Sequence, residues 1–351
     1  MKQFTVYSLQ FTVFLETQDS QLETLWGHTM VDLHLLEMKD WGKESNRKGF
    51  RNGLIKAGEQ NSQVVALCAD LTGSIQMDGF AEKFPERFVE VGVAEQNMVT
   101  VASGMAKMGK IPFTASYAAF SPGRNWEQIR TTICLNNQPV KIVGAHAGLY
   151  TGADGATHQI LEDVALMRVL PNMVVIVPSD SVETEKATLA LAKDPRPGYL
   201  RLARDAFPVI TTEKTPFEIG KAYVFSPGQD VTIIANGTMT SVAMEAAEKL
   251  FHDGIDAEVI HCPTVKPLDS ATILTSVKKT GKVITIEEGQ IAGGLGSAVT
   301  ELLSEHLPVR VYRMGVKDVF GQSGTPEELL EHYGLTVKHI MMKAHELVED
   351  I

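Results

Sequence analysis

The chain has 351 residues, which is more than one average domain needs and enough for two. Hydrophobic residues make up 44% and charged residues 21%, a composition typical of a folded globular protein and not of a disordered one. The formal net charge of −11 argues against a nucleic-acid-binding protein, because binding to a phosphate backbone requires clustered Lys and Arg.

The first 42 residues show no clear domain pattern. The sequence QFTV at residues 3–6 recurs at residues 10–13, and no small-residue cleavage site follows, so a signal peptide is not predicted. Met30 and Met38 lie shortly before the region where regular patterning begins. We therefore expect residues 1–42 to be an extension, either disordered or the result of a mis-assigned start.

A first series of alternating strands and helices is predicted within residues 43–210. The runs typical of strands are residues 64–69, 88–91, 111–113, 140–145, 173–177 and 199–202. Helices are predicted at residues 95–108, 127–135, 161–170 and 182–192. Such alternation implies crossover connections and a mostly parallel sheet.

A second series follows a linker at residues 211–226, in a region where Pro208, Pro216 and Pro227 interrupt the pattern. Within residues 227–351, strands are predicted at 231–235, 257–261, 283–286 and 309–313, and helices at 241–252, 270–279, 296–305 and 327–332. The predicted fold class is therefore α/β, with two doubly wound domains built on mostly parallel sheets.

The compartment is predicted from cysteine usage and hydropathy. The three cysteines, Cys68, Cys134 and Cys262, are far apart in the sequence and form no CxxC pair. Reduced, buried thiols in a cytoplasmic protein are therefore expected. No run of about 18 apolar residues occurs, so no membrane association is predicted.

Glu95 lies in the sequence VGVAEQN at residues 91–97, where a predicted strand turns into a predicted helix. A Glu in the first turn of a helix complements the helix dipole, which is a structural explanation for its presence. A functional role requires other chemically suitable residues elsewhere in the chain.

Two aromatic residues, Tyr117 and Phe120, end the strand-like segment PFTASYAAF at residues 112–120. Aromatic residues at this spacing usually belong to a core. They are also suited to form a stacking surface for a flat heterocyclic ring.

A glycine-rich loop, HAGLYTGADGATHQ at residues 146–159, follows the predicted strand at 140–145 and contains His146, Asp154 and His158. Loops at the carboxyl ends of parallel strands are the usual ligand-binding positions in open α/β sheets. Zinc is one possible ligand, but spacings of eight and four residues match no common zinc pattern. These residue types are suited to hydrogen bonding and proton transfer on a polyhydroxylated substrate.

The sequence has no GxGxxG, no GxxxxGK[ST] and no motif that would hold a Mg²⁺-diphosphate group. A chain of this kind can still bind a nucleotide-like ligand if a partner supplies the phosphate site.

Together with LEDVALMRVLPNM, which precedes VVIVPSD, the segments around Glu95 and His146–His158 resemble the transketolase family. The resemblance runs from about Arg47 to Leu335 and covers the family's pyrimidine-binding and C-terminal domains. It implies thiamine-diphosphate-dependent transfer of a ketol unit in the pentose phosphate pathway. It also implies that a separate N-terminal subunit supplies the diphosphate-binding domain and Mg²⁺, in an assembly of two copies of each chain around a two-fold axis.

The resemblance also implies roles for individual residues. Glu95 matches the family's Glu that hydrogen-bonds the pyrimidine ring nitrogen, Tyr117 and Phe120 match the ring-stacking aromatics, and Asp70 matches a position near the cofactor. His146 and His158 match catalytic histidines that contact the donor and acceptor hydroxyls, and Asp154 matches the contact to the acceptor's C2 hydroxyl. The sugar-phosphate contacts are matched by Arg47, Ser74 and Arg204.

The residues themselves leave alternatives open. Two guanidinium groups and a hydroxyl suit a phosphate dianion, but Arg47 could equally be a solvated charge and Arg204 could pair with Asp205. The related 1-deoxy-D-xylulose-5-phosphate synthases share much of the loop, and His146 favours transketolase over them. A non-catalytic partner subunit is a third reading, disfavoured because Glu95, Asp154 and His158 are all present.

Overall fold

The computed structural model describes residues 33–349. The QFTV repeat and most of the predicted extension therefore lie outside the described residues. The remainder of that segment includes a 3-10 turn, η1 (Met38–Asp40), and the backbone N–H of Leu36 donates to the carbonyl of Ile210 at 3.0 Å.

The first sheet of the described chain has seven strands in the order β12-β6-β7-β5-β4-β2-β3. Every neighbouring pair is parallel except β12, which runs antiparallel to β6. The strands are β2 (Val64–Cys68), β3 (Phe88–Glu90), β4 (Ile111–Tyr117), β5 (Lys141–Ala145), β6 (Val174–Ile176), β7 (Gly198–Arg201) and β12 (Thr264–Lys266).

Helices cover both faces of this sheet, which explains why β2, β5 and β7 are buried at every position. In β2, Val65 and Leu67 pack into one buried cluster while Val64 and Ala66 pack into another on the opposite face. The helices are α2 (Asn46–Gln60), α3 (Asp78–Lys83), α4 (Glu95–Lys107), α5 (Trp126–Gln128), α6 (Asp163–Arg168) and α7 (Ser181–Lys193).

Helices α2 and α3 were not predicted, and two further features of this half differ from the sequence prediction. The helix predicted at residues 127–135 is the short α5 followed by a π-helical stretch, η3 (Ile129–Cys134), in which the hydrogen bonds are one residue longer than in an α-helix. The strand predicted at residues 111–113 extends to Tyr117.

The second sheet has the order β14-β13-β10-β11-β9 within the described residues. Its strands are β9 (Tyr223–Ser226), β10 (Val231–Ala235), β11 (Ala257–His261), β13 (Val283–Gln290) and β14 (Val311–Val316). Only β9, which falls in the predicted linker, runs antiparallel, at the edge beside β11. The helices are α8 (Met239–His252), α9 (Ser270–Thr280), α10 (Leu295–His306), α11 (Pro326–His332) and α12 (Val337–Glu349).

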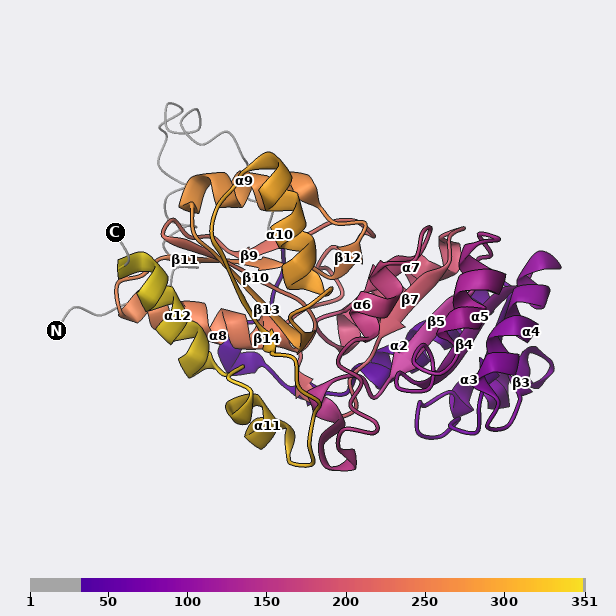
Figure 1. Cartoon of the computed structure of the whole chain (residues 1–351). Helices are drawn as coiled ribbons and strands as arrows, with labels where there is room; N and C mark the ends of the chain where they lie inside the picture. Colours follow the sequence, from indigo (N-terminus) through magenta and orange to yellow (C-terminus); the bar gives the residue numbers. More distant parts are fainter. Residues whose placement is uncertain (1–32, 350–351) are drawn as a thin grey trace, which may run out of the picture. The chain divides into compact units, whose positions relative to one another are not determined.

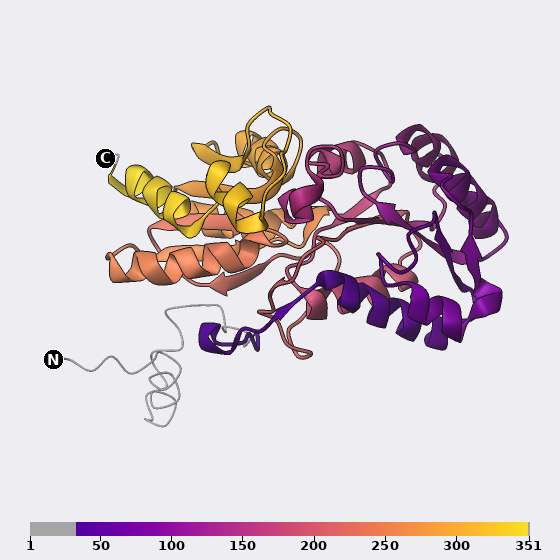
Figure 2. The same ribbon diagram turned by 90° about the horizontal axis from the view of Figure 1, so that it is seen from below.

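The predicted α/β class, with two doubly wound and mostly parallel sheets, is confirmed (Figures 1 and 2). Strand β12 links the two halves, because it comes from the second half of the chain but pairs with β6 in the first sheet. A buried hydrogen bond at 2.8 Å between Nε2 of His261 and Oε2 of Glu183 also joins them. Near the start of the domain, β1 (Lys43–Glu44) pairs with β8 (Phe207–Pro208).

The three cysteines are all buried and free.

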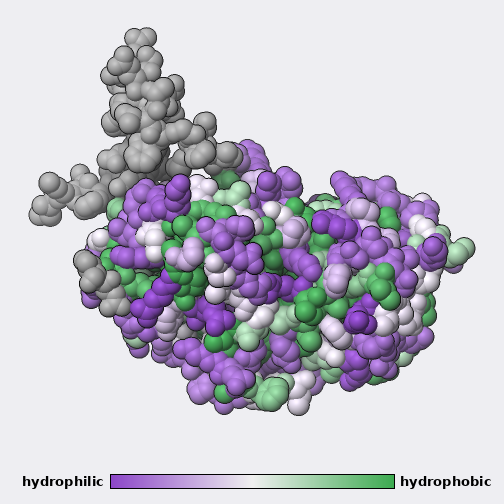
Figure 3. Space-filling model, turned by 45° about the horizontal axis from the view of Figure 1, so that its top comes forward, coloured by the Kyte–Doolittle hydropathy of each residue, from purple (hydrophilic) through white to green (hydrophobic). Residues whose placement is uncertain are grey.

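On the face shown in Figure 3, hydrophilic side chains predominate and hydrophobic ones appear between them in separate patches. Among the described residues, no helix combines the length and apolar character needed to cross a bilayer.

Candidate functional site

The candidate residues gather where the parallel strands of the first sheet end. Glu95 follows β3 and begins α4, Tyr117 is the last residue of β4, and His146 follows β5 directly. Arg204 comes three residues after the end of β7. Because β7, β5, β4, β2 and β3 are neighbours in the sheet, these positions lie along one edge, where α/β sheets usually bind ligands.

The carboxylate of Glu95 is buried, with 2% of the residue's surface exposed. Its Oε2 accepts a hydrogen bond from Nη1 of Arg124 at 2.8 Å, and its backbone carbonyl accepts one from Nδ2 of Asn125 at 2.9 Å. The ion pair compensates the cost of burying the charge, as does the position at the start of α4. The sequence did not assign a role to Arg124, although it lies four residues after Phe120.

The aromatic residues form a wall together with both histidines. The rings of Tyr117 and His146 stack with centroids 3.8 Å apart at an interplanar angle of 24°, and Phe120 stacks beside Tyr117 at 6.0 Å. The edge-on contact of Phe120 with His158 spans 5.4 Å, and the guanidinium of Arg124 lies 4.7 Å from the Phe120 ring centroid. Tyr117 and Phe120 are half-buried, so this wall is not simply part of the core.

His146 is held as a neutral imidazole. It has a positive φ of 53°, is 3% exposed, and donates or accepts no hydrogen bond at Nδ1 within the described part of the chain. Burial, followed by the positive charges of Arg47 and Arg204, lowers the pKa of His146 to about 3. A buried imidazole nitrogen without a partner suits contact with a ligand.

Arg47 is not a solvated charge. From the first turn of α2, its Nη1 donates to the carbonyl of Ser74 at 2.6 Å and its Nη2 to the carbonyl of Arg204 at 2.7 Å. Its Nε donates to Oγ of Ser45 at 3.1 Å. Burial lowers the pKa of Arg47. The contact to Ser74 uses the backbone and leaves that exposed hydroxyl available.

Arg204 pairs primarily with the glycine-rich loop. Its Nη1 lies 3.3 Å from Oδ1 of Asp154 and 2.9 Å from the carbonyl of Thr151, while its Nε is 3.9 Å from Asp205. The alternative pairing of Arg204 with Asp205 is therefore the weaker of its two carboxylate contacts. No group of three or more His, Cys, Asp or Glu among residues 33–349 is placed to hold a metal ion.

Asp70 follows β2 with a positive φ of 60° and is exposed. Its backbone N–H donates to Oε1 of Glu90 at 2.7 Å, and the same oxygen accepts from the N–H of Gly92 at 2.9 Å. None of the hydrogen bonds, ion pairs or ring contacts described for residues 33–349 joins Asp70 to the other candidates. Glu90 instead connects the Asp70 turn to the turn that precedes Glu95.

Family models match most of the chain. The transketolase pyrimidine-binding domain matches residues 43–209, and the transketolase C-terminal domain matches residues 220–340.

Individual proteins are also similar over most of the chain. A putative transketolase C-terminal section from Methanocaldococcus jannaschii is 43% identical over 303 residues, covering 86% of this chain and 95% of the relative. A 6-deoxy-6-sulfo-D-fructose transketolase subunit from Clostridium sp. is 42% identical over 296 residues, covering 84% and 92%.

A 1-deoxy-D-xylulose-5-phosphate synthase from Symbiobacterium thermophilum is 38% identical, and the match covers 85% of this chain but 46% of the synthase. Among solved structures, a split-gene transketolase described as an inactive beta4 tetramer matches with a TM-score of 0.82 and 44% identity. That match covers 87% of this chain and 98% of the solved one.

Proposed function

This chain belongs to the transketolase family, and we propose that it is the C-terminal subunit of a split transketolase. In this proposal it contributes to the transfer of a two-carbon ketol unit from a ketose phosphate to an aldose phosphate. A separate N-terminal subunit supplies the diphosphate- and Mg²⁺-binding domain. The observation that carries the proposal is the row of strand ends that brings Glu95, Tyr117 and His146 to one edge of the first sheet.

The residues at this edge fit the pyrimidine half of thiamine diphosphate. A flat, nitrogen-containing ring requires an aromatic surface and a buried hydrogen-bonding carboxyl group, and Phe120 and Glu95 offer these two features. Arg124 connects them, since it pairs with Glu95 and lies over the Phe120 ring. In this proposal Asp70 lies near the cofactor, at the edge of the site. When bound, thiamine diphosphate supplies the nucleophilic carbon that cleaves the ketose and holds the two-carbon unit.

The sugar end of the site is built from charged and neutral donors. Arg47 and Arg204 present two guanidinium groups to the phosphate of the substrate, with the exposed Ser74 hydroxyl beside them. Asp154 accepts from Arg204 and remains exposed for contact with a sugar hydroxyl. Because His146 is neutral, its free Nδ1 can form a hydrogen bond with a substrate hydroxyl. His158, whose ring lies edge-on to Phe120 at 5.4 Å, contacts a second substrate hydroxyl in this proposal.

The assembly follows from the division of the site between two chains. We propose two copies of each subunit around a two-fold axis, with this chain making contacts to its own copy as well as to the N-terminal subunit. The proposed location is the cytoplasm, and neither a membrane nor a nucleic acid is a partner.

A coupled assay tests the proposal. The chain alone, and the chain mixed with a candidate N-terminal subunit, are given xylulose 5-phosphate and ribose 5-phosphate with thiamine diphosphate and Mg²⁺. Activity in the mixture alone is the expected result. Since one relative is named for a sulfonated sugar, 6-deoxy-6-sulfofructose belongs in the donor panel.

Two other outcomes identify the alternatives. Condensation of pyruvate with glyceraldehyde 3-phosphate, without ketol transfer between sugars, identifies a 1-deoxyxylulose-5-phosphate synthase. An absence of both activities, in a mixture that forms a stable complex, identifies a non-catalytic partner. Glu95→Gln tests the cofactor contact, with the exposed Glu127→Gln as its matched control, and only the first is expected to abolish the activity at low thiamine diphosphate.

A further inference from the structure

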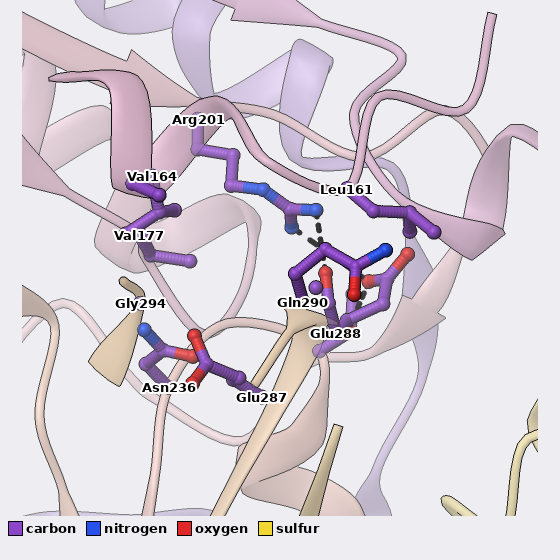
Figure 4. Close-up of a pocket in the computed structure, with 12 residues that line it drawn as sticks. Leu161, Val164, Val177, Arg201, Asn236, Glu287, Glu288, Gln290 and Gly294 are labelled. Carbon is purple, nitrogen blue, oxygen red and sulfur yellow. Dashed lines mark hydrogen bonds and ion pairs between the residues drawn. The ribbon is translucent and has the colours of Figure 1, made fainter. Parts of the chain in front are cut away.

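The second half of the chain forms hydrogen bonds to the loop that carries His146, Asp154 and His158 and to the residues just after it. At the end of β13, Oε1 of Glu288 accepts the backbone N–H of Tyr150 at 2.8 Å. Two residues later on the same strand, the N–H of Gln290 donates to the carbonyl of Leu161 at 2.8 Å. One strand end therefore holds both flanks of the loop, and Figure 4 shows Glu288, Gln290 and Leu161 close together.

Glu288 is itself fixed from several sides. Its Oε2 accepts from Oγ1 of Thr238 at 2.6 Å and lies 3.8 Å from Nη1 of Arg201. Arg201 also donates through Nη2 to the Glu288 carbonyl at 2.7 Å and through Nε to Asp163 at 3.0 Å. All these side chains are buried. The contacts with Thr238 and Arg201 therefore fix the orientation of the Glu288 carboxylate (Figure 4).

The loop is shaped to accept this contact. Gly148 has a φ of +78°, and a Cβ placed there would lie 2.3 Å from Oε1 of Glu288 and 2.4 Å from Nη2 of Arg201. The next residue, Leu149, is fully buried in the core of the second half, and Tyr150 packs against that core. Residues 148–150 are therefore anchored in the C-terminal domain, while Ala147 just before them stays hydrogen-bonded to the carbonyl of Leu202, beside the first sheet, at 3.0 Å.

A short path leads from this anchor to the candidate site. Thr151, the residue after Tyr150, donates from Oγ1 to the carbonyl of His146 at 2.6 Å. The carbonyl of Thr151 accepts from Nη1 of Arg204, which in turn lies next to Asp154. A shift of the Tyr150 backbone would therefore displace His146 and Arg204 together.

We propose that Glu288 is a positioning residue. Through its hydrogen bond with the Tyr150 N–H, the C-terminal domain fixes the positions of His146 and Arg204 in the site. The proposal rests on the function proposed above, since it concerns the same site. It gives the C-terminal domain a task in substrate recognition, although no candidate residue of the site lies in that domain.

Hydrogen exchange on the chain alone tests the anchor without any partner or cofactor. Glu288→Ala is expected to speed amide exchange across residues 148–154 by roughly tenfold, because a buried hydrogen bond is lost. Glu288→Gln keeps an acceptor oxygen for the Tyr150 N–H and is expected to restore most of the protection. If Glu288→Ala does not fold, Thr238→Val, which removes one support of the carboxylate, is expected to loosen the same residues to a smaller extent.

The matched control is Glu183→Gln. Glu183 is also a buried carboxylate that joins the two halves, through His261, but it makes no hydrogen bond to the loop. If the two domains merely separate, amide exchange in the loop should rise in both variants. If Glu288 holds the loop in place, exchange should rise only in the Glu288 variant.

In the active mixture, Glu288→Ala is expected to raise KM for the sugar phosphate and to lower kcat, each by roughly tenfold, while Glu183→Gln leaves KM unchanged. Unchanged loop exchange in Glu288→Ala, or the same kinetic pattern in Glu183→Gln, would overturn the proposal. An inactive wild-type mixture contradicts the proposed function instead, and the exchange measurement still decides whether Glu288 holds the loop.

Discussion

The phenol ring of Tyr117 lies flat against the imidazole of His146, with ring centroids 3.8 Å apart and an interplanar angle of 24°. Tyr117 ends β4 and His146 follows the neighbouring parallel strand β5, whose register pairs Tyr117 with Ala145. The stack therefore follows directly from the sheet. It keeps His146 turned toward the site at a positive φ that few residues adopt.

This stack predicts a difference between two variants of Tyr117. Tyr117→Leu removes the aromatic face and is expected to lower kcat/KM of the reconstituted enzyme by roughly three- to tenfold, corresponding to a ring contact of about 0.5–1.5 kcal/mol. Tyr117→Phe keeps the ring and should stay close to wild type. Steady-state kinetics with both subunits measures the effect, and an equal loss in both variants would show that the hydroxyl matters instead.

The protonation state of His146 is a second prediction. Its pKa is lowered from the ordinary value of 6.5 to about 3, first by burial and then by Arg47 and Arg204. In an NMR titration, the His146 imidazole signals, assigned with His146→Gln, should not move between about pH 5 and 8. A transition near pH 6.5 would contradict the neutral role given to this residue.

The same shift affects stability. The unfolded chain binds a proton at His146 below about pH 6.5, but the folded chain does not until about pH 3. The contribution of His146 is therefore complete above the unfolded pKa and is lost as the pH falls through this window. The free energy of unfolding of the wild type, minus that of His146→Gln, should decrease from pH 6.5 downward.

Glu287 is expected to show the opposite dependence. Burial raises its pKa from 4.5 to about 7, although the backbone N–H groups of Leu295 and Gly296 partly stabilise the charge. A raised folded pKa gives a contribution that is present below about pH 4.5 and lost as the pH rises through about 7, by up to about 3 kcal/mol. Glu287→Gln should remove this slope in denaturation curves measured from pH 4.5 to 8, while lowering stability overall.

A pair of glycine substitutions tests the packing of α2 on α7. At Gly49, a Cβ would lie 1.9 Å from the backbone carbonyl oxygen of Ser181, so Gly49→Ala should destabilise the fold by about 1–3 kcal/mol or more. At Gly104 in α4, no atom lies within 4 Å of the added Cβ, so Gly104→Ala should stabilise it by about 0.4–1 kcal/mol. Thermal or urea denaturation gives both values, and a neutral or stabilising Gly49→Ala would contradict the close helix contact.

The sequence by itself determined most of the α/β architecture. Strands β10 and β11 lie at the predicted residues, 231–235 and 257–261, because each is a short run with β-branched residues between turn residues. The loop with His146, Asp154 and His158 could likewise be recognised, because its residue types and its place after a strand are local properties of the chain.

Only the tertiary structure shows features that depend on contacts between residues far apart in the sequence. Helix α2 was not predicted, since Gly49, Gly53 and Gly58 lower its intrinsic helix propensity, and only the close approach of α7 explains Gly49 and Gly53. The antiparallel pairing of β12 with β6 joins residues nearly ninety positions apart, which no short window of sequence can indicate. For the same reason, the contact between Glu288 and Tyr150 was invisible in the sequence: it depends on how two separately patterned domains meet.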